Sequence, residues 1–245
     1  MKIPKLIHQI IFNETFLPNE ITENIRYLKN NNPDFEYKFY DKKNIFNFVS
    51  AQYGNSVLSR LKKINPNYGA VLADIFRYLL IYKLGGIYLD VKSTLKKPLQ
   101  EVIKADWSFI ISQWNNSNVT SRYYRFGLHP KFLLTPGGEY QNWFIVSEPN
   151  HPFLKKVIER VLFNIDNYFA SRDWVGLYGV LRLSGPIAYT LAISEVISDS
   201  KYKNFDYTFL DASELGFEFS IYADNYSHKK IFRNDYNFLK EPIIL

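Results

Sequence analysis

The sequence lacks several features that would reveal its chemistry at once. It has no cysteine among 245 residues, which excludes a disulfide framework and a thiolate metal site and is typical of a reducing compartment. It also lacks the glycine-rich phosphate loop, the His-Glu-x-x-His zinc motif and the nucleophile elbow of serine hydrolases. The classes that depend on these motifs are therefore excluded. A carboxylate pair for glycoside hydrolysis is not excluded, because the two residues of such a pair can lie far apart in the sequence and meet only in the folded protein.

Long apolar runs and long charged runs are missing too. No segment approaches the roughly 18 apolar residues of a membrane span, and the amino-terminal apolar stretch is too short for a signal peptide. We therefore expect a cytoplasmic protein, with peripheral membrane contact as an alternative. The net charge of +6 is spread over scattered lysines and arginines, so we expect no nucleic-acid partner. A mildly basic chain suits sugar diphosphates or an anionic surface, although lysine pairs alone are usually just solvated.

What the sequence does contain is an alternation of short apolar runs and helical patterns. With 47% hydrophobic and 22% charged residues, it has the composition of one folded domain. Strands separated by helices predict an α/β domain with a mainly parallel sheet. The predicted strands cover 6–12, 35–40, 87–89, 107–113 and 143–147, and the predicted helices cover 19–30, 42–64 (as two), 68–84, 153–169 and a segment opened by Ser184 as N-cap and Pro186.

Two regions carry no helix or strand prediction. The segment 114–138 is polar, aromatic and punctuated by glycine, so we interpret it as a long loop over a site. The segment 172–182 is also interpreted as a loop. The last 40 residues alternate short β-like runs with turns.

The most informative stretch is 68–93. Its apolar helix carries Asp74 and Arg77, which lie three residues apart and so share one face. The helix ends at Gly85-Gly86, and a short apolar strand then delivers Asp90. Ligands of open α/β sheets bind beyond the carboxyl ends of strands, which is where Asp90 is expected. Spacing alone leaves two interpretations open, a structural ion pair or a ligand site.

Lys92 follows Asp90 by two residues. In an extended segment the two side chains would project to the same side. A second acid at this position would complete a two-carboxylate site for Mg²⁺ or Mn²⁺, whereas a lysine could itself neutralise a departing diphosphate. An exposed ion pair on a turn is the structural alternative.

Several segments together resemble glycosyltransferase family 32, the glycosyltransferases with a DXD sugar-binding region. Residues 73–93 read ADIFRYLLIYKLGGIYLDVKS and are similar to the family's A-D-x-x-R-Y…G-G-x-Y-x-D-x-D segment. The opening IPKLIHQI resembles its first strand, Asn142 to Phe153 its mid-domain segment, and Ser184-Gly185-Pro186 its later turn. The family includes yeast-type mannosyltransferases and bacterial capsular enzymes of polysaccharide biosynthesis.

The resemblance implies a single GT-A domain, a Rossmann-like nucleotide-binding fold. It also implies sugar transfer from a UDP- or GDP-sugar to a glycan hydroxyl with retention at the anomeric carbon. The alternative is a non-catalytic relative that binds nucleotide sugars or glycans. By position, the implied catalytic residues are Asp74, Arg77 and Asp90, and the implied substrate-binding residues are His8, Gln9, Tyr88, Lys92, Asn142, Ser184 and Gly185.

The metal site is where this sequence departs from the family's pattern. The family commonly has a second aspartate where this chain has Lys92, so direct coordination of Mn²⁺ or Mg²⁺ depends on Asp90 and a ligand near the carboxy terminus. His228 is the candidate, with Asp224, Asn225 and Lys229 beside it. The hypothesis as a whole requires one condition in space: Asp74, Arg77 and Asp90 must meet.

Overall fold

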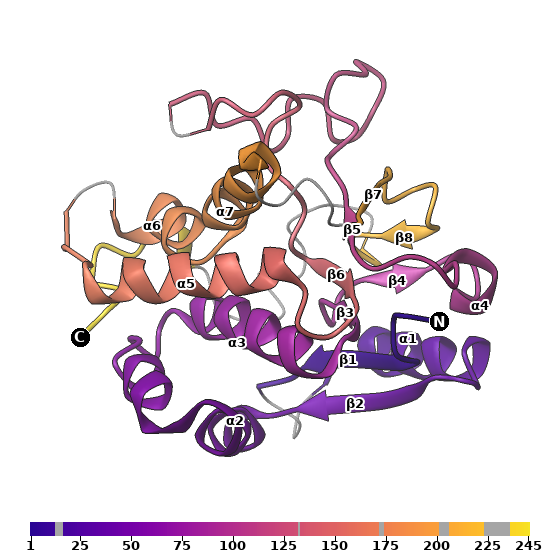
Figure 1. Cartoon of the computed structure of the whole chain (residues 1–245), viewed down its shortest axis with the longest axis horizontal. Coiled ribbons are helices and arrows are strands. Elements are labelled where there is room, and N and C mark those ends of the chain that lie inside the picture. Colours follow the sequence, from indigo (N-terminus) through magenta and orange to yellow (C-terminus); the bar gives the residue numbers. More distant parts are fainter. Residues whose placement is uncertain (13–16, 132, 172–173, 201–205, 223–235) are drawn as a thin grey trace.

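A central four-stranded sheet organises the chain (Figure 1). The computed structural model describes residues 1–12, 17–131, 133–171, 174–200, 206–222 and 236–245. The strand order is β2-β1-β3-β6, with β1 parallel to both β2 and β3, and β6 antiparallel to β3. The mainly parallel sheet is therefore confirmed. Its strands are β1 Leu6–Ile10, β2 Glu36–Tyr40, β3 Gly86–Leu89 and β6 Phe144–Ser147.

Helices cover this sheet on both sides. Helices α3, α5, α6 and α7 lie together in Figure 1, and α1 lies beside β1. Most bounds agree with the sequence predictions within a few residues. The helices are α1 Asn19–Asn31, α2 Lys42–Lys62, α3 Gly69–Leu84, α4 Leu99–Val102, α5 Pro152–Asp166, α6 Gly176–Leu183 and α7 Pro186–Ser198, with a 3₁₀ turn η3 at Tyr236–Phe238.

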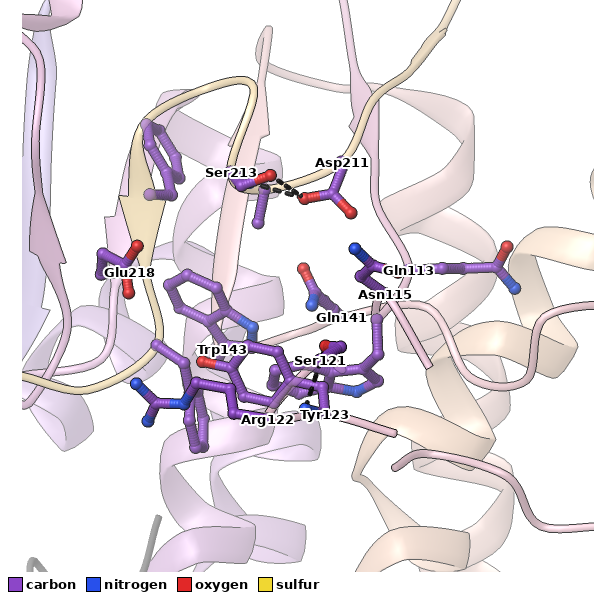
Figure 2. Close-up of a pocket in the computed structure, with 14 residues that line it drawn as sticks. Gln113, Asn115, Ser121, Arg122, Tyr123, Gln141, Trp143, Asp211, Ser213 and Glu218 are labelled. Atoms are coloured by element: carbon purple, nitrogen blue, oxygen red, sulfur yellow. Dashed lines mark hydrogen bonds between the residues drawn. The ribbon is translucent and has the colours of Figure 1, made fainter. Parts of the chain in front are cut away.

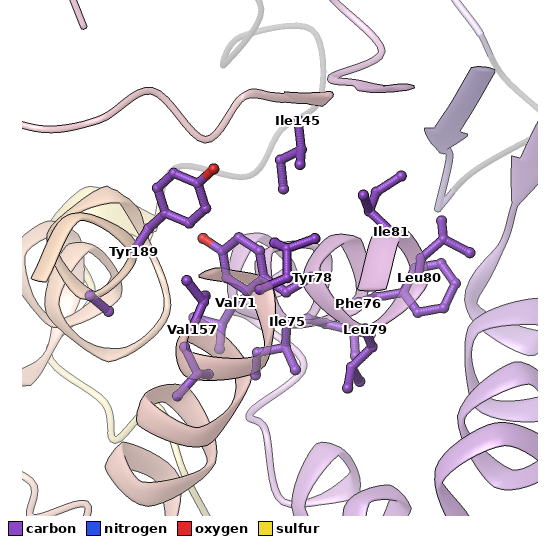
Figure 3. Packing of buried hydrophobic residues seen from close by; sticks show 14 of the residues in the cluster. Val71, Ile75, Phe76, Tyr78, Leu79, Leu80, Ile81, Ile145, Val157 and Tyr189 are labelled. Carbon is purple, nitrogen blue, oxygen red and sulfur yellow. The ribbon is translucent and has the colours of Figure 1, made fainter. Parts of the chain in front are cut away.

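The sheet separates two hydrophobic clusters. Successive residues of a strand point to opposite faces, and β3 shows this clearly. Tyr88 packs into the larger cluster with α3, α5 and α7, while Ile87 and Leu89 pack into the smaller one with α1, α4 and Phe217. Figure 3 shows the larger cluster, where Tyr78 of α3 stacks on Tyr189 of α7 at 5.5 Å between ring centroids. Burial on both faces explains the nearly continuous apolar runs of β1 and β3.

Local sequence signals set several helix ends. Asp41 forms a capping box with Asn44 at the start of α2. A non-helical Gly54 divides α2, so the prediction of two helices over 42–64 is confirmed. Helix α3 stops at Gly85, whose φ of 64° favours glycine. The next strand begins at Gly86, one residue before its predicted start.

Three sequence predictions are wrong in part. The strand predicted over 107–113 is reduced to β5 Ile110–Ile111, which pairs with β7 Thr208–Phe209 in a separate sheet. The expected loop 172–182 contains α6. Ser184 is not the N-cap of α7, because Gly185 occupies that position and the Ser184 hydroxyl donates elsewhere. A third small sheet pairs β4 Thr94–Leu95 with β8 Phe217–Glu218.

One helical run also departs from the expectation about membrane spans. Among the described residues, Gly176–Ser198 is long and apolar enough to cross a membrane by length and composition. It consists of α6 and α7, which meet at Ser184-Gly185. Because 61% of its most apolar window is buried inside the fold, its apolar character is explained by core packing.

Candidate functional site

Asp90 lies directly beyond the carboxyl end of β3. Its backbone N–H donates to the Trp143 carbonyl at 2.8 Å, and its own carbonyl accepts from Ser93 N–H at 2.8 Å. The second bond closes a turn over 90–93, so the extended geometry expected for Asp90 and Lys92 is wrong. The two side chains still meet, with 3.5 Å between Lys92 Nζ and Asp90 Oδ2.

Arg77 brings the two aspartates together. Its Nη2 lies 3.3 Å from Asp74 Oδ1 and 3.1 Å from Asp90 Oδ1, and its Nη1 donates to the Asn142 carbonyl at 2.6 Å. The guanidinium also lies over the Tyr88 ring, 4.7 Å from its centroid. The prediction that Asp74, Arg77 and Asp90 meet in space is thus confirmed. We call these three residues, with Tyr88 and Lys92, the charged cluster.

Asp74 is anchored by two residues from distant parts of the chain. Ser184 Oγ donates to Asp74 Oδ2 at 2.9 Å, and Asn142 Nδ2 donates to Oδ1 at 3.3 Å. Tyr78 links these partners, because its hydroxyl accepts from Asn142 Nδ2 at 2.7 Å and donates to the Ser184 carbonyl at 2.8 Å. The sequence predictions named Asn142 and Ser184 but missed Tyr78. Its position one helical turn after Asp74 was the available signal.

Burial dominates the electrostatics of Asp74 and Arg77. Desolvation raises the pKa of Asp74 to about 6, although Arg77 and the Ser184 hydrogen bond act against the rise. Burial acts to lower the pKa of Arg77, but the interactions with Asp90 and then with Tyr88 and Asp74 outweigh it and hold that pKa above its ordinary value. Arg77 therefore stays charged and fixes the positions of both carboxylates.

Tyr88 and Gln9 complete the surroundings of Asp90. The Tyr88 hydroxyl donates to Asp90 Oδ1 at 2.9 Å, and Gln9 Nε2 donates to the Asp90 carbonyl at 3.3 Å. Tyr37 in turn donates to Gln9 Oε1. The structure thus brings both predicted residues to Asp90, where Gln9 supports the backbone and Tyr88 the carboxylate.

His8 and Gly185 do not reach the charged cluster with their own functional groups. The His8 ring nitrogens lie 3.1 Å from the Tyr40 hydroxyl and 3.1 Å from the Gly85 carbonyl, which precedes β3, whereas Asp90 follows it. Burial lowers the pKa of His8 to about 4, so the ring is neutral. Gly185 allows α6 and α7 to approach, because a Cβ there would lie 2.9 Å from Leu181 Cα. Both residues have structural positions.

The charged cluster balances two carboxylates against two cations. Asp90 Oδ1 contacts Arg77 and Tyr88, and Oδ2 contacts Lys92, whose ammonium also lies 4.1 Å from the Phe219 ring centroid. Within the described part of the chain, no group of three His, Cys, Asp or Glu side chains gathers as a metal site. As arranged, these residues do not fit a divalent ion. The candidate ligands His228, Asp224, Asn225 and Lys229 lie outside the described residues.

A cavity of about 180 Å³ adjoins the charged cluster. Figure 2 shows the residues that line this cavity. Its wall includes Trp143, whose carbonyl accepts from Asp90, and Phe219, which contacts Lys92. Part of the loop predicted over 114–138 lines it, so that loop does lie against a hollow beside the cluster. No role was predicted for these aromatic residues, because aromatic content alone does not distinguish a residue that lines a cavity from a core residue.

Comparison with known structures defines the class of this fold. The glycosyltransferase PaToxG shows a TM-score of 0.51 at 19% identity, covering 82% of this chain and 73% of that one. The UDP-bound glycosyltransferase domain of the YGT toxin shows a TM-score of 0.54 at 10% identity, covering 97% and 88%. The fold is that of the GT-A glycosyltransferases, as predicted.

Sequence comparison matches the region that contains the charged cluster to a family model. Residues 18–110 match the family described as "Glycosyltransferase sugar-binding region containing DXD motif", which confirms the resemblance. This region includes Asp74, Arg77, Tyr88, Asp90 and Lys92.

Individual relatives are also similar over larger parts of the chain. The chain is 24% identical over 179 residues to inositol phosphoceramide mannosyltransferase 1 of Schizosaccharomyces pombe, covering 72% of this chain and 48% of the relative. It is 25% identical over 218 residues to the initiation-specific alpha-1,6-mannosyltransferase of the same yeast, covering 80% and 49%. An uncharacterized glycosyltransferase of Acanthamoeba polyphaga mimivirus is 25% identical over 249 residues, covering 94% and 88%. The chain thus spans about half the length of the two yeast relatives.

Proposed function

We propose that this protein is a glycosyltransferase that moves a sugar from a nucleotide-sugar donor to a hydroxyl of a glycan or glycoconjugate. The observation that carries the proposal is the Arg77–Asp90 pair at the carboxyl end of β3, inside the matched sugar-binding region. The UDP-bound toxin domain of the same fold supports a UDP-sugar donor, and the yeast mannosyltransferases support GDP-mannose. Retention of the anomeric configuration belongs to the same proposal, as do a cytoplasmic location and peripheral contact with a membrane.

The exposure of the charged residues suggests a division of roles. Asp90 and Lys92 retain 20% and 13% of their side-chain surface, whereas Asp74 and Arg77 retain 9% and 7%. Asp90 and Lys92 therefore contact the donor, and the buried pair positions Asp90. The sequence prediction gave Asp74 and Arg77 direct contacts with the donor sugar, but their burial favours the positioning role.

Lys92 carries the electrostatic part of the proposed mechanism. Negative charge grows on the diphosphate as it leaves, and a fixed cation at that point stabilises the transition state. In this chain the Lys92 ammonium, held by Asp90 and Phe219, is placed to supply that charge. Mn²⁺ or Mg²⁺ would supply the same charge if Asp90 and the segment around His228 held it.

A second candidate function follows from the same lysine. Replacement of the second acid by Lys92 would leave a protein that binds a nucleotide sugar or glycan without transferring it. The described carboxylates do not form a metal site. If turnover requires a metal held by these carboxylates, the binding function is therefore favoured over transfer.

The test is donor turnover in the absence of an acceptor. The protein is incubated with UDP-sugars and GDP-mannose, with and without Mn²⁺, and release of UDP or GDP is followed while calorimetry measures binding of the nucleotides. We expect nucleotide release that Asp90→Ala abolishes. Binding without release identifies the second candidate, and a protein that neither binds nor hydrolyses any donor contradicts both.

A further inference from the structure

The cavity beside the charged cluster has a wall of aromatic rings. The Trp114 ring lies 4.7 Å from the Tyr123 ring, 5.1 Å from Phe219 and 6.4 Å from Trp143, measured between centroids. All four residues line the cavity. Aromatic faces next to polar groups suit the C–H faces of a sugar ring, which is apolar on its faces and polar at its edge.

The aromatic wall is held in place before any ligand arrives. Trp114 Nε1 donates to the buried Glu139 at 2.8 Å, and the other oxygen of that carboxylate lies 2.7 Å from His129 Nε2. Asn116 Nδ2 donates to the carbonyls of Phe126 and Gly137, which ties together two parts of the loop. A loop without regular secondary structure thereby becomes a rigid platform, and preorganisation lowers the entropic cost of binding.

Polar side chains line the cavity beside the aromatic rings. They include Gln113, Asn115, Gln141 and Ser213, together with Arg122 and two acids, Asp211 and Glu218. Glu218 is paired with Lys96, whose Nζ lies 2.6 Å from Oε1, and both hydrogen bonds from Ser213 to Asp211 go to Oδ1. Two acids against two cations leave little net charge, so the cavity suits a neutral polyhydroxyl ligand.

The size of the cavity limits the ligand to one ring. Pockets for drug-sized ligands measure about 300–1,000 Å³, and a cavity of about 150 Å³ in another protein accepts benzene. The volume of about 180 Å³ therefore fits a single six-membered ring. A whole nucleotide sugar does not fit.

One buried donor in the wall is without a partner. Trp143 Nε1 makes no hydrogen bond within the described residues. An unpaired buried N–H costs about 1–3 kcal/mol. The atom is covered in this arrangement, so a ligand oxygen reaches it only when the rim shifts slightly. A hydroxyl that does so removes this cost.

We propose that this cavity is the acceptor subsite and binds one neutral hexopyranose ring of the acceptor. The proposal rests on the proposed function, since an acceptor implies transfer. The cavity shares Trp143 and Phe219 with the surroundings of Asp90 and Lys92, which places a bound ring next to the donor site. A hydroxyl of that ring then lies on the side from which it attacks the donor sugar: its oxygen forms the new glycosidic bond, the bond to the diphosphate breaks, and the hydroxyl proton leaves with the diphosphate or to solvent.

Direct binding tests the subsite independently of turnover. Methyl glycosides of glucose, mannose and galactose are titrated against the protein, with tryptophan fluorescence as the readout because Trp114 and Trp143 are two of its four tryptophans. We expect a saturable response to at least one glycoside, in the presence and in the absence of UDP. Failure of all three glycosides to bind, or their displacement by UDP, overturns the proposal.

Variants of neighbouring tyrosines locate the binding. Tyr123 lines the cavity, whereas Tyr124 is 49% exposed and outside the lining, so Tyr124→Ala is the matched control. We expect Tyr123→Ala to weaken glycoside binding, and to raise the acceptor KM, about tenfold. Tyr123→Phe keeps the ring and restores binding, and UDP affinity changes less than about twofold in every variant. Equal acceptor KM for Tyr123→Ala and Tyr124→Ala overturns the subsite.

The two proposals fail in different ways. If the protein never releases a nucleotide from any donor but binds a glycoside in a Tyr123-dependent way, the proposed transfer fails and only a sugar-binding cavity remains. If transfer proceeds and Tyr123→Ala leaves the acceptor KM unchanged, the transferase is confirmed and the acceptor binds elsewhere.

Discussion

The charged cluster and the neighbouring cavity wall share a border but differ in how their polar groups are satisfied. In the cluster, Arg77 contacts both aspartates, and Asp74 accepts from Ser184 and Asn142 as well. In the cavity wall, the Asp211 side chain accepts hydrogen bonds from Ser213 on its own turn, and Trp143 Nε1 is buried without a partner within the described residues. A cluster paired internally fixes geometry, whereas a polar side chain that lines a hollow and bonds locally can contact a ligand. The two regions should therefore respond differently to substitution.

The largest effect on stability is expected from Arg77→Met. Loss of the guanidinium leaves Asp74 and Asp90 without their shared cation, and removal of one partner of a buried pair costs about 3–5 kcal/mol. The free energy of unfolding is measured by urea denaturation. Arg26→Met is the control, because the Arg26–Glu23 pair is exposed and such pairs contribute about 0–1 kcal/mol. A loss below about 1 kcal/mol for Arg77→Met would show that the cluster is not energetically coupled.

The next largest effect is expected on turnover, from Asp90→Asn. Loss of one preorganised electrostatic group typically lowers kcat by about 10²–10³. Donor hydrolysis is measured for this variant and for Asp34→Asn, an exposed aspartate paired with Lys5. We expect the control to retain its rate. Turnover of Asp90→Asn within twofold of the parent protein would remove Asp90 from the site.

The pH dependence of stability should reveal Asp74. Folded Asp74 holds its proton up to about pH 6, while the unfolded chain releases it near 3.8. The folded state binds more protons between these values, so this group's contribution falls as the pH rises, by up to about 3 kcal/mol. Asp74→Asn lacks the contribution, and its stability relative to the parent should rise between pH 4 and pH 7 in urea titrations.

Two buried histidines act with the opposite sign in the same titration. Burial lowers the pKa of both His8 and His151 to about 4, so the unfolded state binds more protons between about pH 4 and 6.5. Their contribution to stability is lost as the pH falls through this window. The parent protein and Asp74→Asn both contain these histidines. The difference between their free energies of unfolding therefore isolates the contribution of Asp74. A difference that does not change with pH would contradict the raised pKa of Asp74.

Lys92→Asp tests the residue that contacts both the charged cluster and the cavity wall. The substitution changes the local charge by two units and removes the cation that Asp90 Oδ2 contacts. If Lys92 replaces the charge of a metal, the variant should gain a divalent-cation requirement, with about tenfold stimulation of turnover by Mn²⁺ over a chelator. Lys92→Met, which offers no new ligand, should lose turnover without rescue. Equal behaviour of the two variants would refute the idea.

The smallest effect is expected from Asp211→Ala in the cavity. The Asp211 side chain accepts hydrogen bonds from Ser213 on its own turn, so the free energy of unfolding should change by less than about 0.5 kcal/mol. The same urea measurement compares Asp211→Ala with Asp74→Ala, which removes a carboxylate from the buried charged cluster. Similar losses in the free energy of unfolding for the two variants would contradict the proposed difference between the charged cluster and the cavity wall.

The charged cluster was predictable because its signals are local. A spacing of three residues places Asp74 and Arg77 on one helix face, and Asp90 follows a strand that Gly85-Gly86 introduces. These are properties of consecutive residues. The parallel pairing of β1 with β3 follows from apolar runs separated by helices, which is again a pattern along the chain.

Other features escaped prediction because distant segments create them. Ser184 has the sequence of an N-cap, but its hydroxyl donates a hydrogen bond to Asp74, and this tertiary contact overrides the local preference. Tyr78 reads as a core residue until Asn142 and Ser184 surround it. Helix α6 was interpreted as a loop because its helical pattern is short. The substrate-binding role of His8 was implied by the resemblance alone, and its ring is hydrogen-bonded inside the core.

The sequence by itself determined the α/β alternation, the mainly parallel sheet and the residues that form the charged cluster, because helix periodicity and strand ends are set by neighbours in the chain. Only the tertiary structure decided which way the buried carboxylates point, that Lys92 shares Asp90 with Arg77, and that residues near 114, 143 and 219 enclose one cavity. These outcomes depend on side-chain packing between segments far apart in sequence. A local sequence pattern does not predict such packing.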